Sequence, residues 1–191
     1  MFVFDVETLS KKSNAVILSM AVTYFDPVKK TSYEEMRNDT FFVKFNVADQ
    51  IKRHQRAMDK STLDWWSKQC LNVRVKSLKP SNNDVTFEEG YAAMSEWIKA
   101  KNDPKCYVWA RGNLDQIVLD DYLDQIGIEP VWFFTRWRDV RTAIDFMYGS
   151  SDGYTTVNYE GFNPFVDITK HDPVDDVIYD AMMLMYGENK E

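Results

Sequence analysis

The distribution of apolar and polar residues along the chain predicts strands that alternate with helices. The run from Ala15 to Phe25 is almost continuously apolar, which is typical of a central strand that is buried on both faces. Elsewhere, short apolar runs predict strands, and apolar residues at helical spacing predict helices. The predicted strands are 1–8, 15–26, 39–47, 105–110 and 133–138, and the predicted helices are 61–69, 86–101, 113–127, 140–148 and 173–186.

Three segments lack either pattern and are expected to be irregular. Residues 48–60 are charged, residues 80–84 read Pro-Ser-Asn-Asn-Asp, and residues 149–165 are rich in turn-forming residues. We find no repeat and no domain linker, so residues 1–191 are expected to form one domain. The order of elements favours the α/β class, with a mixed β-sheet flanked by α-helices.

The first predicted strand carries two carboxylates, Asp5 and Glu7. Successive side chains on a strand point to opposite faces, so Asp5 and Glu7 share a face with Val3. Their Cα atoms are about 7 Å apart, which lets both side chains reach one metal site. Burying two like charges side by side is costly unless a cation joins them. Taken alone, the pattern also fits an edge strand with a solvated acidic face.

A second group of polar residues precedes the C-terminal helix. Pro173 suits the first helical position and Asp172 suits the N-cap, while Gly187 ends the helix. His171 lies just before this helix and Asp176 lies in its first or second turn, so the junction can aim both at one place. Asp180, one turn further on, is the alternative to Asp176.

A third carboxylate follows the strand predicted at 105–110. A glycine turn at Gly112 leads into a helix, and Asp115 lies in its first turn. The alternative role for Asp115 is to complement the helix dipole.

In order along the chain, these residues resemble the DEDDh class of 3′-5′ exonucleases, which have an RNase H-like fold. The resemblance covers nearly the whole chain and is strongest to the exonuclease A group of tailed phages and its small bacterial exoribonuclease relatives. Residues 62–69 resemble that group's T-x-x-W-W-x-x-Q helix, and residues 138–142 resemble its R-D-x-R-T segment. Pro173 is a departure, because many members carry alanine there.

The resemblance implies that two divalent cations, Mg²⁺ or Mn²⁺, are held by Asp5, Glu7, Asp115 and Asp176. It implies that Glu7 and His171 are catalytic, with His171 as the general base. Hard oxygen ligands suit these ions, and two cations can serve both the attacking water and the anionic transition state. The expected activity is hydrolysis of single-stranded DNA 3′ ends to 5′-mononucleotides. The alternatives are an exoribonuclease acting on RNA overhangs, a module that binds nucleotides or nucleic-acid ends without turnover, and a proofreading subunit.

Candidate substrate contacts lie on the same segments. Trp65 and Trp66 point about 100° apart on a helix, so one is expected in the core and the other exposed, where it can stack on a base. Gln69 lies one turn beyond Trp65. Arg138 is a candidate for phosphate contact, although Asp139 beside it is expected to cap the next helix. The expected substrate-binding residues are Thr8, Trp65, Trp66, Gln69 and Arg138.

The composition limits which binding partners and which cellular compartment are expected. The net charge of −7 argues against extensive wrapping of duplex nucleic acid, and leaves a short single-stranded end as the expected partner. Cys70 and Cys106 do not make a disulfide framework, which favours a reducing compartment. No apolar run is long enough to span a membrane, and a strand at residue 2 leaves no room for a signal peptide. A cytoplasmic protein with no membrane partner is expected.

Overall fold

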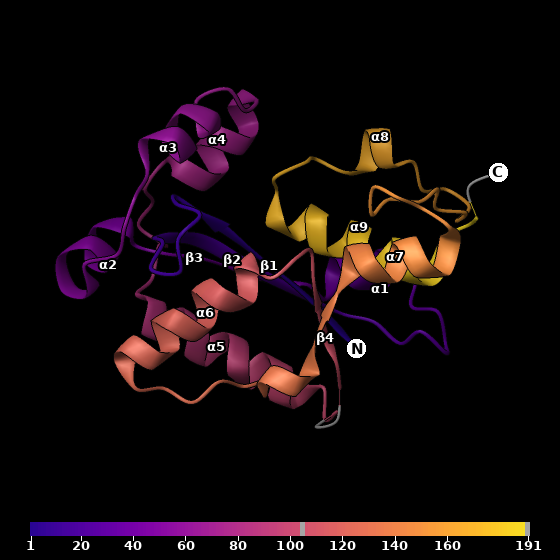
Figure 1. The fold of residues 1–191 in the computed structure, drawn as a ribbon, viewed down its shortest axis with the longest axis horizontal. Coiled ribbons are helices and arrows are strands. Elements are labelled where there is room, and N and C mark those ends of the chain that lie inside the picture. The colour runs from indigo at the N-terminus through magenta and orange to yellow at the C-terminus, as the bar shows by residue number, and fades with distance from the viewer. Residues whose placement is uncertain (104–105, 190–191) are drawn as a thin grey trace.

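The computed structural model describes residues 1–103 and 106–189, and its centre is a mixed sheet in the order β3-β2-β1-β4-β5 (Figure 1). Strands β1, β2 and β3 form an antiparallel meander, and β4 and β5 continue the sheet parallel to β1. The strands are β1 (Phe2–Thr8), β2 (Ile17–Tyr24), β3 (Phe41–Lys44), β4 (Val108–Ala110) and β5 (Trp137–Asp139). The strand start predicted at Lys105 lies outside the described residues.

Helices cover both faces of the sheet. Helices α5 and α6 pack on one face, and α1, α7 and α9 pack on the other (Figure 1). Helices α3 and α4 stand apart and bury Trp66 and Val73 against Leu9, just beyond the end of β1. The helices are α1 (Tyr33–Asn38), α2 (Val47–His54), α3 (Lys60–Trp66), α4 (Leu71–Leu78), α5 (Phe87–Ala100), α6 (Leu114–Ile126), α7 (Val140–Tyr148), α8 (Pro164–Asp167) and α9 (Pro173–Tyr186).

The alternation of side chains along β1 decides where the acidic residues go. Phe2, Phe4 and Val6 lie in the core under α5 and α6, whereas Val3 lies in the core under α9. Asp5 and Glu7 therefore face the α9 side of the sheet, as the sequence predicts.

Two predicted helix caps are confirmed. The carboxylate of Asp172 accepts a hydrogen bond from the backbone N–H of Val174 at 3.1 Å and begins α9. The carboxylate of Asp139 accepts one from the N–H of Thr142 at 2.6 Å and begins α7. Each cap joins a residue near the sheet to a helix that covers it, so the caps fix where these helices start.

The expectation of an irregular segment at 48–60 is wrong for residues 48–54, which belong to α2, and holds for residues 55–59 between α2 and α3. Its exposed face is charged, and the one residue it buries is polar: Gln50, whose amide binds both the N–H and the carbonyl of Ile17. Because the buried position of α2 is polar, the sequence lacks the apolar spacing that would have predicted this helix.

Two further helices, α1 and α4, were also not predicted. Helix α1 begins with a capping box of Ser32 and Glu35, a signal that the sequence does contain. Helix α4 begins at Leu71, and the side chain of its N-cap residue, Cys70, makes no capping hydrogen bond within the described residues.

The strand predicted at 133–138 is mostly wrong. Residues 134–136 form a 3₁₀ turn, and the strand begins only at Trp137. Phe133 and Phe134 are both exposed, so their apolar side chains do not mark a buried strand. The long segment 149–165 is largely irregular, as expected, until α8 begins at Pro164. Within the described ranges, no helix has both the length and the apolar character needed to cross a membrane.

The contact between α5 and β3 requires a glycine. A Cβ at Gly90 would lie 2.5 Å from a ring carbon of Phe45 and 2.9 Å from a methyl group of Val43. We therefore expect Gly90→Ala to destabilise the protein by about 1–3 kcal/mol through overpacking, partly offset by about 1 kcal/mol from the better helix propensity of alanine. Thermal unfolding measures the net effect, with Glu96→Ala at an exposed position of the same helix as the control. An alanine variant that melts above the wild type would show that the helix can move away from β3.

Candidate active site

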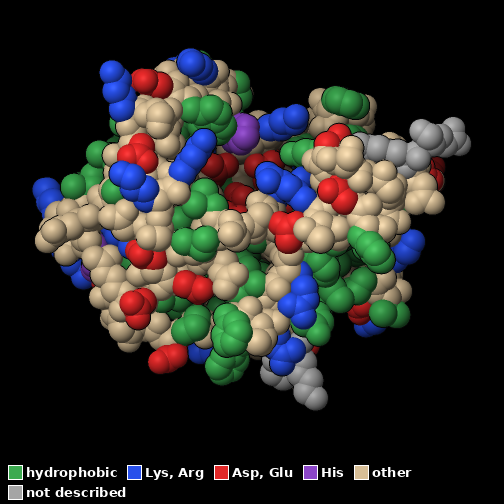
Figure 2. Space-filling model, viewed as in Figure 1, with side chains coloured by type: hydrophobic (Ala, Val, Ile, Leu, Met, Phe, Trp, Pro, Cys, Tyr) green, Lys and Arg blue, Asp and Glu red, His purple; other side chains and the backbone are tan. Residues whose placement is uncertain are grey.

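Four carboxylates from three distant segments meet on the α9 side of β1. Asp5 and Glu7 come from β1, Asp115 from the start of α6 and Asp176 from the start of α9. The charges of Asp5, Asp115 and Asp176 all raise the pKa of Glu7, which places the four carboxylates close together. Figure 2 shows Asp and Glu side chains at the bottom of a hollow, with a histidine and several Lys and Arg side chains on its rim.

Glu7, Asp176 and His171 form the tightest part of this cluster, because one ligand atom from each lies within 4.8 Å of the other two. The backbone N–H of His171 donates to the carboxylate of Asp176 at 3.0 Å. His171 adopts a left-handed backbone conformation with φ of 66°, which is uncommon for a residue other than glycine. The bond to Asp176 holds this conformation at the entrance to α9.

The start of α6 brings Asp115 to the same place. Gly112 has φ of 91°, a conformation that favours glycine, and its N–H donates to Asp139 at 2.7 Å. The chain can therefore turn sharply from β4 into α6, which leaves Asp115 buried in the first turn beside β1.

Burial is the main cause of the perturbed pKa values in this cluster. It raises the pKa of Asp176 to about 8 and that of Asp115 to about 7, with neighbouring carboxylates adding to both shifts. The pKa values of Asp5 and Glu7 are raised well above their ordinary values, again by burial first and then by the other carboxylates. The ionised cluster is therefore costly unless a cation joins it.

The donor set fits a divalent cation. Oδ2 of Asp5 is buried and has no hydrogen-bond partner among the described residues. A buried carboxylate oxygen without a partner is costly, and a bound cation would satisfy it. Carboxylate oxygens are the ligands that Mg²⁺ and Mn²⁺ prefer.

Asp180 lies close to the cluster but is already neutralised. It is buried, and its carboxylate accepts hydrogen bonds from Nε of Arg111 at 3.0 and 3.3 Å. Asp176 has no such partner and is the one that joins Glu7 and His171. The geometry therefore favours Asp176 over Asp180 as the acid from α9. Arg111 was not predicted to have a role, and its position between the strand and Gly112 is the only sign of one in the sequence.

The two tryptophans of α3 divide as expected into one buried and one exposed residue. Trp66 is 1% exposed and its indole N–H donates to the carbonyl of Thr8 at 2.9 Å, so it presents no face to a substrate. Trp65 is 39% exposed and its ring contacts that of His171 edge-on, with centroids 4.7 Å apart. Thr8 is itself buried and donates its hydroxyl to the carbonyl of Ser10. Trp66 and Thr8 thus connect α3 to the end of β1.

Of the other two expected substrate contacts, Gln69 is half-buried and Arg138 is exposed, and both have partners within the protein. The amide of Gln69 donates to the carbonyl of Trp65 at 3.0 Å. The guanidinium of Arg138 donates to the carbonyls of Thr135 and Trp137 and lies 4.1 Å from the ring centre of Tyr107. It does line a cavity of about 540 Å³ whose other wall is the start of α6.

Two ion pairs at the rim were not foreseen from the sequence. Lys76 of α4 pairs with Asp172, and Arg37 of α1 pairs with Asp175. Both tie the start of α9 to helices that are remote in sequence, and both lie beside the loop that carries His171. Residues this far apart gave no local signal of the pairing.

The comparisons with known proteins agree with this geometry. Residues 1–187 match the model of the 3′-5′ exoribonuclease Rv2179c-like domain. The chain is 31% identical to an exodeoxyribonuclease of Enterobacteria phage T4, over 97% of this chain and 88% of the phage protein.

A solved structure has the same fold. It is the nuclease domain of 3′hExo, a DEDDh family member bound to rAMP, with a TM-score of 0.65 at 14% identity over 100% of this chain and 95% of that one. The predicted resemblance to the DEDDh exonucleases and the RNase H-like fold class are thereby confirmed. The chain belongs to the 3′-5′ exoribonuclease Rv2179c-like domain family and is a 3′-5′ exonuclease.

Proposed function

We propose that this exonuclease is metal-dependent and removes 5′-mononucleotides from the 3′ ends of single-stranded DNA. The observation that supports this most directly is the buried cluster of four carboxylates with His171 at its edge. Such a cluster is a poor structural element, because its members raise one another's pKa, and a good site for cations.

In this proposal Asp5, Glu7, Asp115 and Asp176 would hold two divalent cations, Mg²⁺ or Mn²⁺. When bound, the cations supply an activated water and charge neutralisation at the phosphate. The carboxylates arrive on β1, α6 and α9, which are rigid elements, so the protein positions its ligands before any ion binds.

His171 is the general base of this proposal. Its side chain is half-buried, and burial lowers its pKa below the ordinary value, with the charge of Lys170 as a smaller cause. The imidazole is therefore neutral at physiological pH and can accept a proton from the attacking water. The hydrogen bond from its backbone to Asp176 and the ring of Trp65 hold it in position.

The substrate contacts are proposed from accessibility. Trp65 offers an exposed ring beside His171 and would stack on the terminal base, because aromatic stacking tolerates any base. Gln69 lies next to it on the surface. Thr8 and Trp66 would act indirectly by placing α3, and Arg138 would contact a phosphate only by releasing the two carbonyls it now binds.

DNA is preferred as the substrate because the phage relative, which matches 97% of this chain, is named an exodeoxyribonuclease. RNA is the second candidate, because the matching family is described as exoribonuclease. The net charge of −7 fits a short bound segment in either case.

We also propose that residues 1–191 form one domain. Two cysteines that form no disulfide within the described residues support a cytoplasmic location.

Turnover on labelled single strands tests the function. DNA and RNA oligonucleotides of one sequence, labelled at the 5′ end, are incubated with Mg²⁺ or Mn²⁺, or with a chelator. We expect stepwise shortening from the 3′ end with metal and none with the chelator, and faster shortening of DNA. Faster shortening of RNA would select the second candidate, and equal rates with the chelator would refute metal dependence.

Replacing His171 tests the general base. We expect His171→Ala to lower kcat by about 10²–10⁴-fold, the usual contribution of a positioned base, with little change in the affinity for a single-stranded end. Glu96→Gln, at an exposed position of α5, is the control and should retain wild-type turnover with Mg²⁺. Near-normal kcat of the alanine variant at saturating metal would remove His171 from the mechanism.

The raised carboxyl pKa values predict how stability depends on pH. Without metal, the folded protein holds protons on Asp115 and Asp176 at a pH where the unfolded chain has lost them. Their stabilising contribution is complete below about pH 4 and is lost as pH rises to about 8, so chelated protein should melt at progressively lower temperature over this range. Asp176→Asn should flatten the decline, and thermal melts from pH 5 to 8 measure it.

Bound metal should restore the stability that is lost as pH rises. Saturation at a hundred times Kd adds about 2.7 kcal/mol to the folded state, so Mn²⁺ should raise the melting temperature of the wild type at pH 8. Asp5→Asn should blunt this rise and should itself stabilise the chelated protein, because it removes one buried like charge. Identical Mn²⁺ shifts in both proteins would mean that the ion binds elsewhere.

A further inference from the structure

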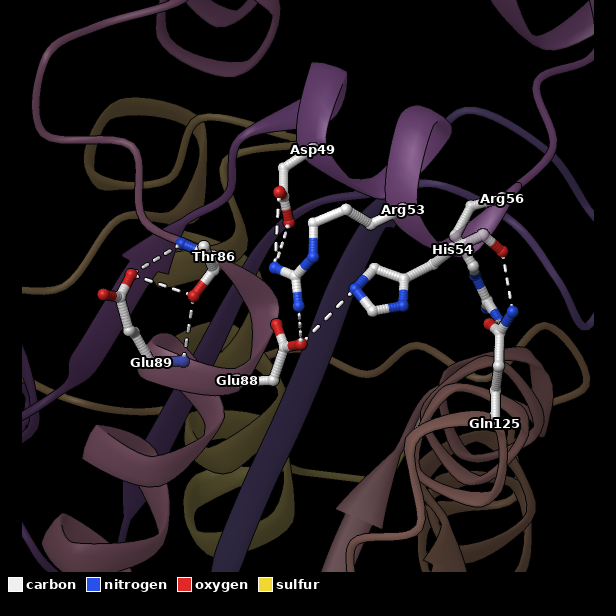
Figure 3. Close-up of polar contacts among 8 residues, drawn as sticks. All are labelled: Asp49, Arg53, His54, Arg56, Thr86, Glu88, Glu89 and Gln125. Atoms are coloured by element: carbon white, nitrogen blue, oxygen red, sulfur yellow. Dashed lines mark hydrogen bonds and ion pairs between the residues drawn. The ribbon is translucent and has the colours of Figure 1, made fainter.

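A second cluster of metal-ligating side chains lies away from the catalytic carboxylates, between α2 and α5. Asp49 and His54 come from α2 and Glu88 from the first turn of α5 (Figure 3). One ligand atom from each lies within 4.8 Å of the other two.

The two helices that carry these residues are fixed independently of the cluster. Gln50 of α2 binds the N–H of Ile17 at 2.9 Å and its carbonyl at 2.6 Å, which locks α2 onto β2. Helix α5 begins with a capping box in which Thr86 and Glu89 satisfy each other's backbone N–H groups (Figure 3). An ion would therefore meet ligands whose backbones are already held in place, which lowers the cost of binding.

Polar atoms around the cluster are buried without partners. The side chain of His54 is only 10% exposed, and its Nε2 faces Oε1 of Glu88 at 3.4 Å without forming a hydrogen bond. Oε2 of Glu88 and the hydroxyl of Tyr122 are likewise buried, with no hydrogen-bond partner in the described part of the chain. Tyr122 is fully buried and its ring centroid lies 5.3 Å from that of His54, while burial and then the charge of Glu88 raise its pKa. Unmatched atoms of this kind indicate a missing ligand.

Arg53 now occupies the space between the two carboxylates. Its Nη1 lies 3.1 Å from Asp49 and its Nη2 lies 2.8 Å from Glu88 (Figure 3). The side chain of Arg53 is 52% exposed, so it can turn into solvent with little loss, because ion pairs at exposed positions contribute little. A doubly charged ion would neutralise both carboxylates and would also bond to the imidazole nitrogen, which now has no hydrogen bond and lies 3.4 Å from Glu88.

We propose that Asp49, His54 and Glu88 bind a divalent transition-metal ion, best fitted by Zn²⁺, which takes the place of the Arg53 guanidinium. One imidazole with two carboxylates is a donor set that Zn²⁺ accepts, at about 2.0–2.2 Å, whereas Mg²⁺ takes oxygen ligands. The bound ion ties α2 to α5 at the base of the segment that leads into α3 and Trp65. It is a structural ion and is separate from the catalytic cations.

The test uses the fact that the chain has only two histidines. In a His171→Asn/Asp176→Asn variant the catalytic cluster loses its imidazole, and His54 is the only one left. Zn²⁺ is titrated into this ¹⁵N-labelled protein while the ring nitrogens are followed by NMR. We expect one equivalent of Zn²⁺ to shift the metal-bound ring nitrogen, and millimolar Mg²⁺ to leave it in place.

Further substitutions on that background identify the ligands. Asp49→Asn and Glu88→Gln should each abolish the shift, and thermal melts with a chelator verify that each variant folds. Arg53→Met should tighten Zn²⁺ binding by about two- to fivefold, because it removes the competing cation. A His54 ring that Zn²⁺ leaves unmoved refutes the site. A shift that persists in both carboxylate variants shows a lone surface imidazole instead, and weaker binding by Arg53→Met refutes the replacement of the guanidinium.

Discussion

The burial of four carboxylates beside one another is the constraint on which the proposed site depends. Asp5 and Glu7 lie on a central strand, where burial favours the neutral acid, and Asp115 and Asp176 are brought against them. The surrounding core must supply enough stability to hold this arrangement. The same strand supplies part of it, because Phe2, Phe4 and Val6 bury their side chains on the opposite face.

Local features of the backbone place the buried carboxylates in a defined geometry. Gly112 lets the chain turn from β4 into α6, and the Asp172 cap starts α9 where Asp176 can reach Glu7. Asp180, one turn further along α9, pairs with Arg111, although its charge still raises the pKa of Asp5, Asp115 and Asp176. Asp180 is therefore held by Arg111, whereas Asp176 lies with Glu7 and His171.

The position of α3 depends on contacts from the same strand end. The indole N–H of Trp66 binds the carbonyl of Thr8, one residue after Glu7, and Trp65 lies against His171. Lys76 of α4 pairs with Asp172 beside that histidine. The α3–α4 pair and the His171 loop therefore contact each other beside the carboxylate cluster, so a shift of one would displace the other.

The sequence by itself determined the strand that carries Asp5 and Glu7, the caps at Asp139 and Asp172, the division of Trp65 from Trp66 and the family. Each of these depends on local periodicity or on a short ordered motif, which the chain displays directly. Only the tertiary structure shows that Asp176 lies with Glu7 and His171 whereas Asp180 pairs with Arg111, because Arg111 lies far away in sequence. The same reason accounts for α2, whose buried Gln50 is satisfied by β2. Contacts between distant segments follow from packing, and neither composition nor spacing records them.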